Sequence, residues 1–215
     1  MVIMTINLAA ELAATRLMAV IRGTDTAAAI ATGIALLTEG VSIVEVALTT
    51  PDACAAIEAI RAAAPAGSLV GAGTVLTTAD VADVAAAGAQ FVVTPAVVES
   101  IAESARRGLP VAAGALTPTE AYTAVQLGAS AIKLFPSSVG GPAYLKAVRD
   151  PFPDIPFVAV GGVGLADLPG YFAAGAIAVG VGGPLVGDAA SGGDLDALRA
   201  RARAYVAATG GVQRS

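Results

Sequence analysis

The 215-residue sequence contains no histidine and no tryptophan, and its only cysteine is Cys54. Without histidine, the chain cannot supply a serine–histidine or cysteine–histidine nucleophile, a histidine metal ligand or a histidine general base. A single cysteine excludes an internal disulfide framework and a metal site built from several cysteines. We interpret Cys54 as a buried helix residue. If the chain is an enzyme, its proton transfers must come from Glu, Asp, Lys, Tyr, Cys or water.

Charge and long apolar runs are also scarce. Charged residues make up 13% of the chain, and the net charge is −5 without a run of like charges. The basic patch typical of nucleic-acid binding is missing, so we expect no nucleic-acid partner. No window of about 18 residues is uninterruptedly apolar, which predicts no membrane span. Residues 1–20 lack a basic n-region and are interrupted by Glu11 and Arg16, so we expect no signal peptide and a cytoplasmic protein.

Hydrophobic residues, in contrast, make up 56% of the sequence, and many of them are alanine. The length suits one domain, spanning residues 1–215, with a sizeable core. So few charges cover a monomer's surface poorly. We therefore predict that a surface patch is buried against identical subunits, in a homo-oligomer.

Short apolar runs rich in β-forming residues alternate with alanine- and leucine-rich helical segments. The runs are 18–22, 41–48, 69–76, 91–97, 111–116, 131–136, 157–163 and 176–183. Continuous apolar strands that alternate with helices are typical of parallel strands covered by helices. Eight such units predict a (β/α)8 TIM barrel of the α/β class. An open doubly wound sheet is the alternative, but VIRGTDTAA (20–28) lacks its GxGxxG motif.

Local patterns predict where several helices begin. Thr117–Glu120 combines an N-cap threonine, a proline at the first helical position and a glutamate at the third, which is a capping box. Residues 50–52 (TPD) and 78–80 (TAD) resemble it. We also predict a last helix over 194–208 and an extra helix near residues 6–15 that closes the bottom of the barrel.

Polar residues that interrupt the apolar runs are the candidates for function, because barrel chemistry takes place at the carboxyl ends of the strands. Lys133 lies in AIKLFP (131–136), where a lysine is unexpected. One interpretation is a lysine whose stem packs and whose head reaches water. The other is a nucleophile that forms a Schiff base, because an apolar pocket favours the neutral amine that attacks a carbonyl.

Glu45 lies in a second apolar run, IVEVAL (43–48). It could form a structural ion pair, but buried pairs are poor stabilisers. An imine-forming lysine also needs a group that moves protons during carbinolamine formation and C–C cleavage, and a carboxylate near the barrel axis can do so. The occurrence of Glu45 and Lys133 in separate strands therefore favours catalysis.

Glycines follow the seventh and eighth runs, in AVGGV (159–163) and AVGVGG (178–183). Backbone N–H groups of such loops often bind phosphate, although ordinary tight turns would look the same. Arg22, at the end of the first run, could bind a carboxylate through two hydrogen bonds or could pair with Glu45 or a surface acid. Residues 137–138 (SS) could bind a polyol chain or cap the following turn.

Several motifs together resemble a known family over about residues 12–205. They are VEVALTTP (44–51), VGAGTVL (70–76), VTPAV (93–97), GALTPTEA (114–121), IKLFPSS (132–138) and AVGGV (159–163). The chain resembles the class I aldolases that cleave 2-keto-3-deoxy-6-phosphogluconate and its relatives, including 4-hydroxy-2-oxoglutarate. Such enzymes use neither a metal nor an organic cofactor, and they are usually homotrimers.

The resemblance implies a role for each matching residue. Lys133 would form the imine with the keto acid, and Glu45 would be the general acid/base. The pyruvate end would be lined by Thr74, Pro95 and Phe135, and the phosphate would be held by Gly161, Gly162, Gly182 and Gly183. Cleavage would release pyruvate and D-glyceraldehyde 3-phosphate.

Three positions depart from gluconate-type members of the family. Thr49 stands where those members often carry the arginine that binds the pyruvyl carboxylate, so this role would pass to Arg22, as in the galactonate-type branch. Val160 replaces a threonine in the substrate site, again as in the galactonate branch. Gly183-Pro184 replaces a serine, which removes a hydroxyl, and the proline has no N–H to donate.

Several functions therefore stay open at the level of the sequence. The substrate could be a gluconate or a galactonate derivative, or a keto acid without phosphate such as 4-hydroxy-2-oxoglutarate. A barrel that binds sugar phosphates without catalysis is a further alternative, which the presence of both Glu45 and Lys133 argues against. A metal-dependent epimerase or aldolase fits poorly, because histidine ligands are missing.

Overall fold

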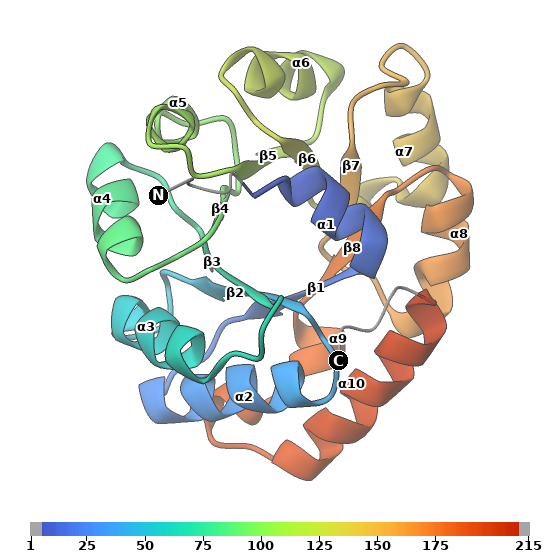
Figure 1. Cartoon of the computed structure of the whole chain (residues 1–215). Helices are drawn as coiled ribbons and strands as arrows, with labels where there is room; N and C mark the ends of the chain where they lie inside the picture. Colours follow the sequence, from blue (N-terminus) through green and yellow to red (C-terminus); the bar gives the residue numbers. More distant parts are fainter. Residues whose placement is uncertain (1–5, 211–215) are drawn as a thin grey trace.

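The computed structural model describes residues 6–210 and shows a closed barrel of eight parallel strands in chain order, as predicted (Figure 1). The strands are β1 (Leu17–Ile21), β2 (Ile43–Ala47), β3 (Leu69–Gly73), β4 (Val92–Val93), β5 (Val111–Ala115), β6 (Ala131–Leu134), β7 (Phe157–Val160) and β8 (Ala178–Val181). β1 pairs with both β2 and β8, which closes the ring.

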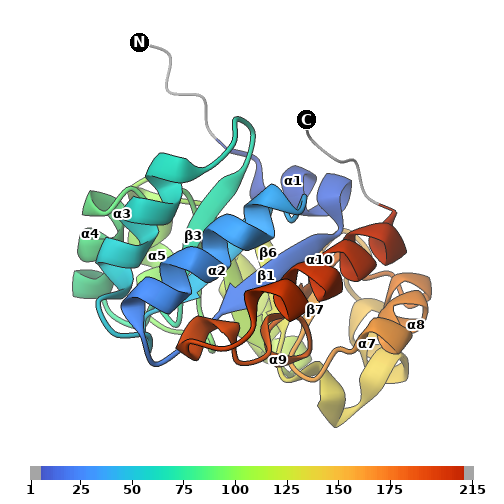
Figure 2. The same ribbon diagram turned by 90° about the horizontal axis from the view of Figure 1, so that it is seen from below.

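Helices surround this ring of strands. They are α1 (Leu8–Thr15), α2 (Thr26–Thr38), α3 (Ala53–Ala63), α4 (Thr78–Ala86), α5 (Ser100–Arg106), α6 (Pro118–Gln126), α7 (Gly141–Arg149), α8 (Leu168–Ala173), α9 (Gly183–Val186) and α10 (Leu195–Thr209), with short 3-10 turns at η1 (Ser137–Val139), η2 (Leu165–Asp167) and η3 (Ala189–Ser191). The first long helix, α2, lies beside the last, α10 (Figure 2). None of the helices in the described part of the chain has the length and apolar character needed to cross a membrane.

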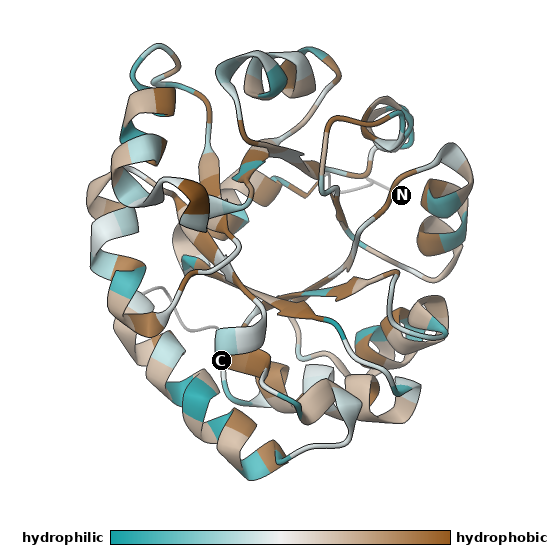
Figure 3. Ribbon diagram, turned by 180° about the vertical axis from the view of Figure 1, so that it is seen from behind, coloured by the Kyte–Doolittle hydropathy of each residue, from teal (hydrophilic) through white to brown (hydrophobic). Residues whose placement is uncertain are grey.

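Two apolar layers hold the barrel together. One lies between the strands and the surrounding helices, and the other fills the barrel itself. The strands alternate between these layers because successive side chains point to opposite faces. Both faces are therefore buried, which explains the continuous apolar runs, and the hydrophilic colour in Figure 3 lies mainly on the helices.

Helix α1 closes one end of the barrel, as predicted for residues 6–15. The Asn7 side chain accepts a hydrogen bond from the Ala10 N–H and so caps the helix. Leu8 and Leu12 are fully buried and pack with Phe91 in the apolar layer that fills the barrel. In Figure 1, α1 lies across the barrel opening inside the ring of helices.

The capping predictions have mixed outcomes. Thr117 and Glu120 form the expected capping box. Near residue 78 the cap is one residue earlier, because Thr77 is the N-cap and pairs with Asp80. The prediction for residues 50–52 is wrong: Asp52 is the N-cap, with φ of 46° and no side-chain hydrogen bond. The hydroxyl of Thr50 instead accepts a hydrogen bond from the Gly23 N–H, in the loop after β1.

Most strands end earlier than the apolar runs predict. The run 91–97 contributes only the two residues of β4 to the sheet, and Thr74 lies just beyond β3 instead of within it. Pro95 has no N–H for a ladder hydrogen bond, and Thr74 has φ of 60°, which is not an extended conformation. The residues beyond these strand ends belong to the loops that form the site.

Candidate active site

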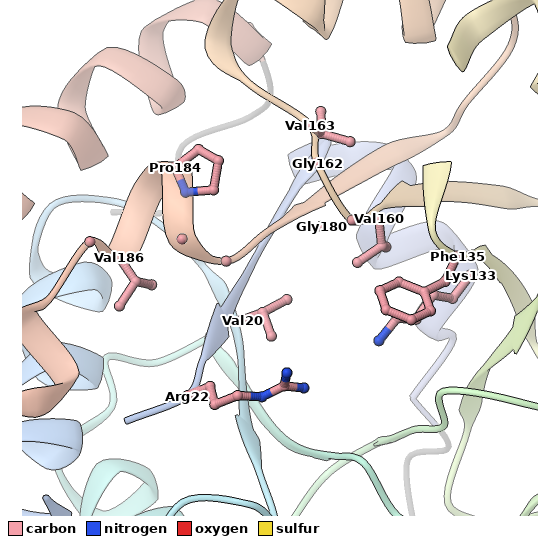
Figure 4. Close-up of a pocket in the computed structure, with 14 residues that line it drawn as sticks. Val20, Arg22, Lys133, Phe135, Val160, Gly162, Val163, Gly180, Pro184 and Val186 are labelled. Atoms are coloured by element: carbon pink, nitrogen blue, oxygen red, sulfur yellow. The ribbon is translucent and has the colours of Figure 1, made fainter. Parts of the chain in front are cut away.

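A cavity of about 320 Å³ opens at the carboxyl ends of β1, β6, β7 and β8 (Figure 4). Eight of the residues predicted from the sequence line it: Arg22, Lys133, Phe135, Val160, Gly161, Gly162, Gly182 and Gly183. Figure 4 shows the charged ends of Arg22 and Lys133 directed into the same space. Glu45, Thr74 and Pro95 are not in the lining.

Glu45 and Lys133 meet inside the barrel. Each points inward from its strand, and their side chains are 1% and 7% exposed, so Lys133 does not extend to the outer surface of the barrel. Lys133 Nζ lies 3.9 Å from Glu45 Oε1, beyond hydrogen-bond distance but close enough for an ion pair. The amine also lies 5.1 Å from the centre of the Phe135 ring. Any carbonyl carbon bound to Nζ would come within reach of the carboxylate.

The surroundings of Glu45 suit a group that takes up and releases protons. Burial raises the pKa of the Glu45 carboxyl above its ordinary value, and the charges of Lys133 and Arg22 act in the opposite direction. Its second oxygen, Oε2, is buried and has no hydrogen-bond partner among the described residues. A raised pKa brings the carboxyl closer to neutral pH, where both of its protonation states are accessible.

Gly73, which the sequence did not single out, leaves room for this carboxylate. A Cβ atom at position 73 would lie 2.8 Å from Glu45 Oε1 and 3.0 Å from its Cδ. Gly73 ends β3 and is paired with Ala47 of β2, so the carboxylate packs over the neighbouring strand. The only sequence signal for this role is the glycine itself, in the strand VGAG (70–73).

Arg22 reaches the cavity from the end of β1, and its Nη2 donates a hydrogen bond of 3.4 Å to the Thr74 hydroxyl. Thr74 has a left-handed backbone (φ of 60°), which is rare for a β-branched residue and costs roughly 1 kcal/mol or more. No ion pair joins Arg22 to a carboxylate of residues 6–210. The predicted alternative of a structural salt bridge is therefore wrong, and the guanidinium can bind a substrate carboxylate.

Pro95 lies beside β5, the strand that pairs with the Lys133 strand β6. Its carbonyl carbon would be 2.2 Å from a Cβ at Gly114, and Gly114 is the partner of Lys133 in the pairing of β5 with β6. The neighbouring Thr94 hydroxyl accepts a hydrogen bond from the Gly114 N–H and donates one to the Ala96 carbonyl. This network holds the loop after β4 against the barrel close to the amine.

The loops after β6 and β7 are joined by Ser137, whose hydroxyl donates to the Leu134 carbonyl at 2.8 Å and accepts from the Val160 N–H at 3.0 Å. Ser137 is 1% exposed, so it ties the turn together and is not free to bind a polyol chain. Gly161 then turns with φ of 92°, and a Cβ there would lie 2.9 Å from the Phe135 ring. These contacts fix Phe135 and the glycine pair relative to each other.

Several residues of the cavity wall were missed by the sequence analysis. They are Val20, Val163, Val186 and Gly187, whereas Gly180 and Pro184 lie in or next to AVGVGG (178–183), which the sequence had already indicated. Apolar side chains of this kind carry no signal that separates a cavity wall from a core. Among residues 6–210, no three Asp, Glu or Cys side chains gather in a way that could hold a metal ion.

The comparison with protein families agrees with this geometry. A family model described as "KDPG and KHG aldolase" matches residues 8–200. The chain belongs to this aldolase family. It is accordingly an aldehyde-lyase, and the barrel described above is the family's fold.

Individual relatives in this aldolase family are similar over most of the chain. A protein of Rhizobium meliloti (strain 1021) named "Probable 2-dehydro-3-deoxy-6-phosphogalactonate aldolase" is 39% identical over 200 residues, which cover 92% of this chain and 94% of the relative. A solved structure described as "Native KDPGal structure" has a TM-score of 0.84 and 37% identity, covering 89% of this chain and 93% of the other. The KDPG aldolase from Legionella pneumophila, "with pyruvate captured at low pH as a covalent carbinolamine intermediate", has a TM-score of 0.79 and 27% identity, covering 96% and 98%.

Proposed function

We propose that this aldolase cleaves a 2-keto-3-deoxy-6-phospho-aldonate, of the galactonate or gluconate type, into pyruvate and D-glyceraldehyde 3-phosphate. The observation that carries the proposal is the position of Lys133, buried in the barrel wall, facing the cavity and 3.9 Å from the buried Glu45. A lysine in this setting suits a Schiff-base nucleophile, and the carboxylate suits the proton shuttle that such a nucleophile needs. The carbinolamine in the Legionella pneumophila relative supports the same chemistry.

The reaction begins when the neutral Lys133 amine attacks the C2 carbonyl of the substrate. The carbinolamine loses water to give an iminium ion, with Glu45 carrying the protons to and from oxygen. Glu45 then removes the proton of the C4 hydroxyl, the C3–C4 bond breaks, and its electron pair moves to the iminium nitrogen to form an enamine. Protonation of the enamine at C3 and addition of water at C2 release pyruvate and restore the amine.

The remaining residues bind and orient the substrate in this proposal. Arg22, held by its hydrogen bond to Thr74, binds the carboxylate through its guanidinium. Thr74, Pro95 and Phe135 enclose the pyruvate end. Backbone N–H groups in the two glycine loops, at Gly161-Gly162 and Gly182-Gly183, hold the terminal phosphate next to Val160. No metal or organic cofactor takes part.

The galactonate type is the favoured substrate. Thr49 cannot provide the arginine of the gluconate type, whereas Arg22 reaches the cavity from β1. The Rhizobium meliloti relative and the solved KDPGal structure bear galactonate names. A keto acid without phosphate, such as 4-hydroxy-2-oxoglutarate, is the second candidate, because the family description includes KHG and Pro184 has no N–H.

The assembly that we propose is a homotrimer of one (β/α)8 domain spanning residues 1–215, located in the cytoplasm. Its surface supports an oligomer, since Tyr122 and Val139 are large apolar side chains that are 53% and 64% exposed. Sedimentation equilibrium measures the mass directly, and a mass of one subunit would contradict the trimer. Recovery of the native protein outside the cytoplasm after cell fractionation would contradict the location.

The test of the proposed mechanism uses pyruvate and borohydride, followed by intact mass and peptide mapping. The sequence contains only two lysines, Lys133 and Lys146. Lys146 is exposed on α7 and pairs with Asp150 at 3.2 Å, so Lys146→Ala is a matched control. We expect one reduced pyruvyl group on Lys133 in the native protein and in Lys146→Ala, and none in Lys133→Ala. An adduct on Lys146, or cleavage by Lys133→Ala, would refute the mechanism.

Substrate choice is then measured as kcat/KM for the galactonate and gluconate phosphates and for 4-hydroxy-2-oxoglutarate. A higher value for the galactonate than for the gluconate phosphate supports the favoured type. A keto acid without phosphate replaces the phosphorylated aldonate as the proposed substrate if removal of the terminal phosphate leaves kcat/KM unchanged. Binding of pyruvate without cleavage of any of these compounds would favour a barrel that only binds ligands.

A further inference from the structure

Arg201, on the outer helix α10, reaches the back of the cavity wall. Its Nε donates a hydrogen bond of 2.8 Å to the Leu185 carbonyl, and its Nη2 donates one of 3.0 Å to the Val186 carbonyl. These carbonyls belong to the last two residues of α9. One guanidinium from the following α-helix therefore binds the end of this short helix through two hydrogen bonds.

The segment that Arg201 holds is part of the cavity. The lining of the cavity includes Gly182, Gly183, Pro184, Val186 and Gly187. Figure 4 shows Pro184 and Val186 in this part of the wall. Carbonyl groups at the end of a helix have no partner within the helix and need donors from elsewhere. Because Leu185 and Val186 are buried, loss of the guanidinium would leave these two carbonyls without those donors.

Gly187 makes the contact possible. It has φ of 61° and ψ of −134°, a conformation that is open to glycine and strained for other residues. A Cβ at this position would lie 2.5 Å from Arg201 Nη2. The same glycine therefore turns the chain after α9 and leaves space for the guanidinium, so the two residues fit each other.

The neighbouring arginines of α10 form ion pairs with a carboxylate instead. Arg199 and Arg203 both pair with Glu39, at 3.0 Å and 2.8 Å, which ties α10 to the end of α2. Arg201 has no carboxylate within ion-pair distance among the described residues. Its donors are directed at the backbone of the cavity wall, and Arg203 offers a control on the same helix.

We propose that Arg201 is a positioning residue that holds the wall from Gly182 to Gly187 where its backbone meets the phosphate end of the substrate. The inference rests on the proposed function. Neither glycine loop contains a lysine or an arginine, so phosphate affinity depends on backbone groups whose place must be fixed before binding. Arg201 therefore controls the KM for a phosphorylated substrate and leaves the chemistry at Lys133 unchanged.

The test compares Arg201→Met, which keeps an apolar stem but removes the donors, with Arg203→Met. The substrate is 2-keto-3-deoxy-6-phosphogalactonate, and borohydride trapping of pyruvate on Lys133 is measured in parallel. We expect Arg201→Met to raise KM about tenfold, equivalent to about 1.4 kcal/mol, with kcat and the pyruvate adduct unchanged. Arg203→Met keeps the native KM. An unchanged KM in Arg201→Met overturns the inference. So does a loss of the pyruvate adduct on Lys133 that equals the loss of affinity for the phosphorylated substrate.

Arg201→Lys tests the same inference if Arg201→Met does not fold. Lysine keeps the charge and can donate to one carbonyl, but it lacks the rigid fork that binds both. The inference requires a KM above that of the native protein, and a native KM in Arg201→Lys overturns it. Failure of the proposed function looks different, because the native protein would then form no adduct on Lys133 or would cleave no phosphorylated substrate.

Discussion

Substitution of Gly73 by alanine tests whether the exact position of Glu45 matters for catalysis. Gly73 is not among the glycines with positive φ, so its backbone accepts alanine without strain. The new Cβ would lie 2.8 Å from Glu45 Oε1, whereas ordinary contacts begin at 3.4 Å. To restore an ordinary contact, the carboxylate must retreat by about 0.6 Å, the difference between these two distances.

The size of the effect follows from this displacement. A misplacement of about 1 Å in a catalytic group can cost about 100-fold in rate. A shift somewhat smaller than this should lower kcat by about 10-fold to 100-fold, or about 1.4 to 2.7 kcal/mol of transition-state stabilisation. Lys133 lies on another strand and is not displaced, so we expect the reduced pyruvate adduct to form on it still.

The assay is a double-mutant cycle with Glu45→Gln, measured as kcat for cleavage of the phosphorylated galactonate substrate. If Gly73→Ala acts by moving the carboxylate, it should change kcat by less than about twofold once the carboxylate is already gone. Equal losses in the native and Glu45→Gln backgrounds would refute the reasoning, as would native kcat in Gly73→Ala. Circular dichroism and thermal unfolding verify that each variant keeps its fold.

Three further predictions concern stability. Burial raises the pKa of Glu45, so the stability that its protonation contributes is fully present below the unfolded pKa and lost as pH rises through the folded pKa. The stability of Glu45→Gln relative to the native protein should therefore increase as the pH rises above the ordinary glutamate pKa of about 4.3, and a difference in urea unfolding that does not change with pH would contradict this. Phe91 is fully buried inside the barrel, and a Cβ at Gly71 would lie 2.6 Å from its ring. Phe91→Ala should therefore lower the free energy of unfolding, measured in urea, by about 3–5 kcal/mol. A loss below about 1 kcal/mol would mean that neighbouring side chains refill the space. Ser137→Ala removes the hydrogen bonds that the hydroxyl makes with the Leu134 carbonyl and the Val160 N–H. It should lower the free energy of unfolding by about 2 kcal/mol and lower kcat, whereas native unfolding and kinetics would show that the hydroxyl is dispensable.

Local patterns in the sequence predicted much of the architecture correctly. The alternation of apolar runs and helices gave the barrel, and the capping box at Thr117 marked the beginning of α6. A similar pattern at Thr50 failed, because its hydroxyl binds the Gly23 N–H from a loop that is distant in the sequence. Local capping patterns hold only where tertiary contacts do not compete for the same groups.

The candidate site was predictable to the extent that its residues are chemically unusual for their surroundings. Lys133 and Glu45 stand out in apolar strands, and Arg22 stands at a strand end. Gly73 and Arg201 could not be found in this way, because glycines and helix-surface arginines are common. Their roles depend on distances to Glu45 and to the carbonyls of α9, which come from the packing of separate strands and helices.

The sequence by itself thus determined the barrel and the two charged residues inside it, because burying a lysine and a glutamate in apolar strands has few explanations. Only the tertiary structure decided that Glu45 and Lys133 face each other. Strands buried on both faces lack the polar alternation that would show which side chains point inward. The pairing of the closed barrel sets that direction and brings the two groups to 3.9 Å.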